Sequence, residues 1–155
     1  MKNRLAMLFA SVFYIGFIPG APGTYASIAA TLVYFLIYHF TKPLVPALHF
    51  STVCLISLIG VLAASRASRI SGIEDPSFIV IDEVAGQLVT FLFLPVSAFN
   101  LILGTAAFRL FDIWKPWPIS LADTKVGGGV GIMLDDLLAA IPAALGLVII
   151  MRFVE

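Results

Sequence analysis

The sequence predicts a single all-α domain, residues 1–155, that is embedded in a membrane and crosses it several times. Composition is the first observation: 61% of the 155 residues are hydrophobic and 12% are charged, whereas soluble domains are usually about 25% charged. The second is that Leu5–Thr41, Pro43–Ser65 and Val84–Phe108 contain no Asp, Glu, Lys or Arg. A helix needs roughly 20 apolar residues to cross a bilayer, so these runs predict a polytopic integral membrane protein.

Breaks in the apolar pattern divide the chain into its expected helices. The Pro- and Gly-rich residues 19–23 and Pro95 interrupt helical pattern, and Thr24 or Ser27 can cap the helix that follows the first break. Residues 71–77 are expected to form a loop, and the polar residues 109–131 precede the last helix. In order, the expected apolar segments are residues 5–18, Thr24 or Ser27 to about Phe40, 44–64, 78–94, 98–108 and 132–153.

The topology around Pro95 allows two arrangements. If residues 84–108 crossed the membrane once, Asp82 and Asp112 would lie on opposite sides. If Pro95 marks the tip of a short helical hairpin, both return to the same side, and each arm reaches only partway across or is shielded by protein. We favour the hairpin because it gathers the acidic residues together. Arg66 and Arg69, at the end of an apolar run, place that region on the cytoplasmic side by the positive-inside rule.

The acidic residues are concentrated in one part of the sequence. Eight of the nine lie between positions 74 and 136. By scales derived from membrane-insertion experiments, placing an Asp at the centre of a transmembrane helix costs about 2.5–3.5 kcal/mol. Acidic residues next to apolar helical segments are therefore candidates for function. The eight residues are Glu74, Asp75, Asp82, Glu83, Asp112, Asp123, Asp135 and Asp136. They predict a polar site at the cytoplasmic membrane face.

Two adjacent carboxylate pairs point to a bound cation. Asp82 and Glu83 lie within apolar sequence, and Asp135 and Asp136 follow the glycine-rich residues 127–131. Neighbouring carboxylates repel one another and remain ionised more easily beside a cation. Glycines also allow a backbone to approach a ligand closely, as in loops that hold phosphate at a helix N-terminus.

A third group mixes both signs of charge. Arg109, Asp112 and Lys115 are spaced three apart, so one helical turn brings neighbours together. Arginine can donate two parallel hydrogen bonds to a phosphate and lysine adds a compact charge, which suggests a phosphorylated substrate.

A site made of carboxylates without His or Cys favours a hard ion such as Mg²⁺. The formal net charge is zero, so nucleic acid is not an implied partner.

Four ordered motifs resemble the phosphatidylglycerophosphatase A family. They start at Pro22 (PGTYAS), Asp75 (DPSFIVIDEVAG), Phe108 (FRLFDIWKPWPI) and Gly129 (GVGIMLDD), and together they cover nearly the whole chain. Two small departures are present: Ala26 and Ala140 stand where the family often has Gly. The resemblance implies an all-helical, Mg²⁺-dependent phosphatase of the bacterial inner membrane that converts phosphatidylglycerophosphate to phosphatidylglycerol and inorganic phosphate.

The resemblance implies that the active-site residues are Asp75, Asp82, Glu83, Asp112, Lys115, Asp135 and Asp136. The expected mechanism is metal-assisted hydrolysis, with Arg109 and Lys115 on the phosphate and either Asp82 or Asp112 as general base. Thr24 and Ser27 are expected to add donors to the phosphate. The carboxylates expected at one or two Mg²⁺ ions are Asp75, Asp82, Glu83, Asp135 and Asp136. A covalent aspartyl-phosphate and the oligomeric state are both left open.

Three other functions compete with this one. Intramembrane carboxylates also mark the pathways of small cation transporters and channels. Here, however, the acids cluster at helix ends beside Arg and Lys, which would repel a permeating cation. A CDP-alcohol phosphotransferase requires an aspartate spacing that this sequence lacks. A structural membrane partner with a degenerate site is disfavoured by the intact acidic motifs.

Overall fold

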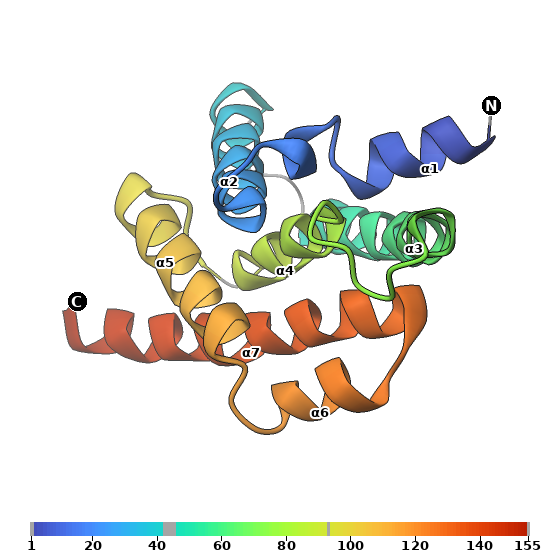
Figure 1. Ribbon diagram of the computed structural model, residues 1–155. Helices are drawn as coiled ribbons and strands as arrows, with labels where there is room; N and C mark the ends of the chain where they lie inside the picture. The colour runs from blue at the N-terminus through green and yellow to red at the C-terminus, as the bar shows by residue number, and fades with distance from the viewer. Residues whose placement is uncertain (1, 42–45, 93, 155) are drawn as a thin grey trace.

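The structure is a computed structural model that describes residues 2–41, 46–92 and 94–154, and it contains no strand among them. This confirms the predicted all-α fold. The chain order is visible in Figure 1. The elements are α1 (Lys2–Ala10), the short 3₁₀ helix η1 (Ile15–Phe17), α2 (Pro22–Thr41), α3 (Pro46–Ser71), α4 (Ile81–Thr90), α5 (Ala98–Trp114), α6 (Ile119–Lys125) and α7 (Gly128–Val154).

Three helices of the described chain are long and apolar enough to cross a membrane. They are Pro22–Phe40 within α2, Ala47–Ser71 within α3 and Gly128–Phe153 within α7. Large apolar side chains on these helices face outward, with Leu58 61% and Leu145 58% exposed. In water such a surface would be unfavourable, but against lipid it needs no polar cover. The chain is therefore a membrane protein.

The short helix α4 lies in the middle of the molecule and packs against α2, α3, α5 and α7 (Figure 1). Its Gly86 permits the closest of these approaches. A Cβ atom there would lie 2.5 Å from the Phe108 ring of α5 and 2.9 Å from the backbone oxygen of Asp136 in α7. The missing side chain thus lets three helices converge just beside Asp82 and Glu83.

The break at Pro95 separates two helices that are each shorter than the three spanning candidates. α4 has 10 residues and α5 has 17. Ser97 caps α5, accepting a hydrogen bond from the backbone N–H of Asn100 at 3.1 Å. The Asn100 side chain donates to the Pro95 carbonyl at 2.9 Å. Whether this pair forms a hairpin that reaches only partway into the bilayer stays a prediction.

Several expected boundaries were wrong. α3 continues to Ser71 rather than ending at residue 64, so Arg66 and Arg69 lie within its last turns. The polar stretch 109–131 contains the end of α5, all of α6 and the start of α7. The last helix begins at Gly128, not near Ile132.

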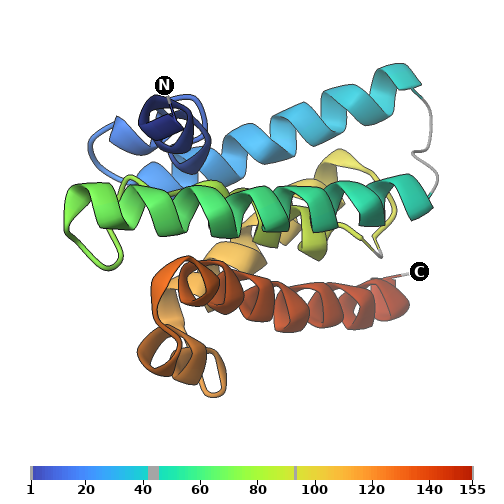
Figure 2. The ribbon, with the colours of Figure 1, turned by 90° about the vertical axis from the view of Figure 1, so that its right-hand side faces the viewer.

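The early start of α7 has a packing cause. A Cβ atom on Gly129 would collide with the Ser65 hydroxyl and the Val61 carbonyl oxygen of α3. Contact with α3 therefore outweighs the poor helix propensity of glycine, and Gly129 serves helix packing. Figure 2 shows α3 and α7 one above the other.

Candidate active site

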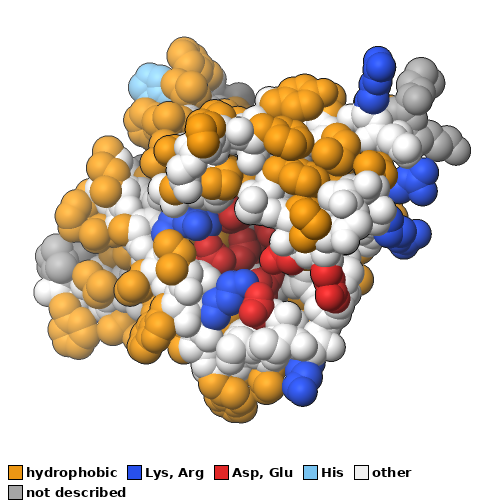
Figure 3. All heavy atoms as spheres, viewed as in Figure 1, with side chains coloured by type: hydrophobic (Ala, Val, Ile, Leu, Met, Phe, Trp, Pro, Cys, Tyr) orange, Lys and Arg blue, Asp and Glu red, His pale blue; other side chains and the backbone are white. Residues whose placement is uncertain are grey.

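Helices α4, α5 and α7 and the segment before α4 bring six of the eight predicted carboxylates to one cavity of about 250 Å³. It is open on the face shown in Figure 3, where acidic side chains lie at the bottom of a hollow, with basic side chains beside them and apolar ones around. The lining residues are Ala21, Pro22, Gly23, Asp75, Ser77, Ile79, Asp82, Glu83, Arg109, Asp112, Lys115, Asp135 and Asp136.

Three carboxylates in this cavity are suited to a metal ion. Asp82, Glu83 and Asp136 each offer an oxygen, and these oxygens lie within 4.8 Å of one another. Asp82 Oδ1, Glu83 Oε2 and Asp136 Oδ2 are buried without a hydrogen-bond partner. Buried polar atoms are normally satisfied, and a hard cation would satisfy all three.

Electrostatics support the same conclusion. Burial is the main cause that raises the pKa of Asp82 well above its ordinary value, and the nearby charges of Glu83 and Asp136 raise it further. Burial also raises the pKa of Glu83, although Asp82 and Arg109 partly oppose that shift. A cation would compensate this repulsion and keep the carboxylates ionised.

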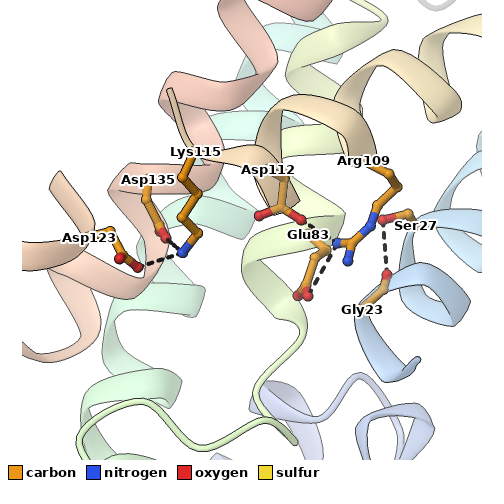
Figure 4. Close-up of polar contacts among 8 residues, drawn as sticks. All are labelled: Gly23, Ser27, Glu83, Arg109, Asp112, Lys115, Asp123 and Asp135. Carbon is orange, nitrogen blue, oxygen red and sulfur yellow. Dashed lines mark hydrogen bonds and ion pairs between the residues drawn. The ribbon is translucent and has the colours of Figure 1, made fainter. Parts of the chain in front are cut away.

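Arg109 lies beside the carboxylates of Glu83 and Asp112 (Figure 4). Its Nη1 atom is 2.6 Å from Asp112 Oδ2 and 3.5 Å from Glu83 Oε1. The pair with Asp112 confirms that one turn of α5 brings these two residues together. Gly23 of α2 leaves the space that both Glu83 and Arg109 occupy, because a Cβ atom there would collide with Glu83 Oε1 and lie 2.9 Å from Arg109 Nη1.

Lys115 does not continue the helical spacing of Arg109 and Asp112. It is the C-cap of α5 with a left-handed backbone (φ 45°), a conformation that is uncommon outside glycine. Its Nζ atom lies 2.5 Å from both Asp123 Oδ1 of α6 and Asp135 Oδ2 of α7. Burial alone would lower the pKa of Lys115, but these two hydrogen bonds outweigh it, so the pKa is raised and the ammonium stays charged.

A second cavity of about 180 Å³ adjoins the first, because Asp75 and Asp135 line both. It adds Glu74, Asp123 and the glycines at the start of α7. Asp123 was among the eight clustered acidic residues, but it was assigned no individual role, since it is separated from the other acids by prolines and by a short helix that the hydrophobic pattern does not reveal.

Thr24 and Ser27 are not among the residues that line the main cavity. Ser27 is fully buried, and its hydroxyl donates to the Gly23 carbonyl at 2.9 Å within α2 (Figure 4). The structure thus brings together Asp75, Asp82, Glu83, Arg109, Asp112, Lys115, Asp135 and Asp136 and leaves the two hydroxyl residues outside.

The chain is similar to known proteins over almost its full length. The profile of the family described as phosphatidylglycerophosphatase A matches residues 8–151. A phosphatidylglycerophosphatase A from Escherichia coli (strain K12) is 35% identical over 149 residues, covering 92% of this chain and 84% of the relative. One from Haemophilus influenzae is 36% identical over 139 residues, covering 89% and 83%.

A third relative has a different name. A protein of Bacteroides thetaiotaomicron, provisionally named a phosphatidylinositol-3-phosphatase, is 36% identical over 143 residues, covering 88% of this chain and 87% of the relative. No solved structure matches the chain.

Proposed function

The chain belongs to the phosphatidylglycerophosphatase A family, and from this premise we propose that it is a Mg²⁺-dependent phosphatase that hydrolyses phosphatidylglycerophosphate to phosphatidylglycerol and inorganic phosphate. The phosphatase activity follows from the family, whereas the ion and this chain's own substrate are proposed. The observation that carries the proposal is the set of buried, unpaired carboxylate oxygens facing Arg109 and Lys115 across one cavity.

Asp82, Glu83 and Asp136 would hold the ion, since their oxygens are close together and lack partners. Asp135 and Asp75 line the same cavity and would complete the oxygen environment of the ion. When bound there, Mg²⁺ would act as a Lewis acid and neutralise charge on the phosphate oxygens.

The protein's own cations would hold the rest of the phosphate. Arg109 would turn its Nη atoms from Asp112 and Glu83 to the phosphate oxygens, forming the paired hydrogen bonds that guanidinium geometry favours. Lys115 would exchange one of its two carboxylate partners for a phosphate oxygen and stabilise charge as the transition state forms.

Asp112 is then the group we assign to proton transfer. Once Arg109 binds phosphate, the Asp112 carboxylate becomes free to accept a proton from the attacking water. The new P–O bond forms to that water and the P–O bond to glycerol breaks. The glycerol oxygen leaves as a hydroxyl after gaining a proton, so one water is consumed for each phosphate released.

The packing of α3 against α7 supports an orientation in the membrane. Gly129 at the start of α7 lies against Ser65 of α3, so the Arg66 and Arg69 end of α3 lies beside the end of α7 that carries Asp135 and Asp136. The positive-inside rule then supports a cytoplasmic active site in a bacterial inner membrane. A lipid could present its headgroup there while its acyl chains remain in the bilayer. No observation on the described residues favours the transporter alternative.

The test is phosphate release in detergent micelles from phosphatidylglycerophosphate and, separately, from phosphatidylinositol 3-phosphate. The intact chain and Asp82→Asn would be assayed with Mg²⁺ and with a chelator, and thermal unfolding would verify that the variant is folded. We expect Mg²⁺-dependent release from the first lipid and its loss in the variant. Faster release from the inositol lipid would overturn the substrate, and release that persists in chelator would overturn the metal role.

A further inference from the structure

Gln87 is a polar residue in the interior that the mechanism does not use. It is 0% exposed, and neither its Nε2 nor its Oε1 atom has a hydrogen-bond partner. Leaving a buried amide unpaired is unfavourable, because its hydrogen bonds to water are lost and not replaced. In the described part of the chain, every other buried side-chain atom without a partner belongs to the cavity residues Asp82, Glu83, Arg109, Asp135 and Asp136.

The position of Gln87 links it to that cavity. It lies four residues after Glu83 on α4, so the two side chains share one helix face, with Gln87 one turn further from the N-terminus. Glu83 on this face meets Gly23 of α2 and Arg109 of α5. Ser27, one turn beyond Gly23, is also fully buried. Gln87 is therefore a buried polar residue one helical turn from Glu83 on the same face of α4.

The unpaired atoms of this region complement one another. Glu83 Oε2 is an acceptor without a donor, and Arg109 Nε is a donor without an acceptor. A carboxamide offers one group of each kind. A hydrophobic side chain of the same length would satisfy neither atom, and a charged one would add repulsion or a second buried charge.

We propose that Gln87 is a positioning residue that connects Glu83 to Arg109 in the substrate-bound site. Its Nε2 donates to Glu83 Oε2, and its Oε1 accepts from Arg109 Nε. This fixes the carboxylate towards the ion and the guanidinium plane towards the phosphate. The inference rests on the proposed function for its role in catalysis, but the effect on Glu83 is independent of turnover.

The experiment uses Gln87→Met, which preserves length and packing but removes both hydrogen-bonding groups. Leu88→Met is the matched control, since Leu88 faces a separate apolar cavity. The measurements are the Mg²⁺ concentration that half-saturates the rise in melting temperature, and kcat and KM for phosphatidylglycerophosphate. Outer partners of metal-binding groups typically contribute about 10–100-fold in affinity or activity.

For Gln87→Met we expect about a 10-fold loss in Mg²⁺ affinity and in kcat, with unchanged or higher melting temperature in chelator. Leu88→Met should match the parent. In an Arg109→Met background, Gln87→Met should cause a smaller further loss of kcat/KM than in the parent, because one of the two proposed partners of Gln87 is already gone. Unchanged Mg²⁺ affinity and kcat in Gln87→Met would overturn the proposal, as would a fully additive loss. If the parent releases no phosphate but Gln87→Met still weakens Mg²⁺ binding, the positioning role stands and the proposed substrate fails.

Discussion

Replacing Gly23 with Ala should separate activity from stability. The new Cβ atom would collide with Glu83 Oε1 and lie 2.9 Å from Arg109 Nη1. Both are the ends of long side chains, so the fold can accommodate the methyl group if they move aside. That movement is on the order of 1 Å, and misplacement of this size at a reacting centre costs about 100-fold. Tenfold in rate corresponds to about 1.36 kcal/mol, so we expect a loss of about 2.7 kcal/mol in transition-state stabilisation.

The assay is kcat/KM for phosphate release, with the melting temperature measured in parallel. Gly146→Ala is the matched control, since a Cβ atom at Gly146 of α7 would meet nothing within 4 Å, and it should leave activity unchanged. A Gly23→Ala variant within about threefold of the parent would refute the reasoning. It would mean that the observed positions of Glu83 and Arg109 are not those the reaction requires.

Three further predictions test other parts of the structure. Lys115→Met should lower kcat by about 100-fold, as measured by a steady-state phosphate-release assay. The substitution removes a proposed hydrogen-bond donor to the phosphate and leaves Asp123 and Asp135 without their shared cation. Gly129→Val should lower stability by about 1–3 kcal/mol through overpacking against α3, measured by unfolding in micelles. In chelator, the melting temperature should fall as pH rises above about 4, because the pKa of Asp82 is raised in the folded chain. The stability due to that group is complete below its ordinary pKa and is lost through the raised one. Asp82→Asn should flatten this decline, and an identical slope in both proteins would contradict the assignment.

Much of the site could be predicted because acidic residues stand out in an apolar chain. Asp82, Glu83, Asp135 and Asp136 interrupt helical runs in which a charge is costly, and their type alone predicts an oxygen-liganding site. Arg109 and Asp112 follow from helical spacing. These residue types and spacings are local features of the sequence, so they can be recognised without knowing how the helices pack.

Part of what the sequence could not reveal depends on contacts between distant segments. The start of α7 at Gly128 depends on Val61 and Ser65 of α3, which no local propensity contains. Lys115 departs from its helical row because its backbone turns left-handed at the end of α5. Ser27 was expected to meet phosphate, yet its hydroxyl is taken up by the carbonyl of Gly23. The first difference follows from tertiary packing, whereas the other two arise within α5 and α2 themselves.

The chain order of the site has a consequence for how the protein is made. Asp82 and Glu83 come from α4 and Arg109 from α5, but Asp136 comes from α7, which is synthesised after both. Until α7 is inserted, the acidic groups of α4 lack both the Asp136 carboxylate and the packing surface beside Gly86. We therefore expect a nascent chain that stops before α7 to lack the proposed metal site.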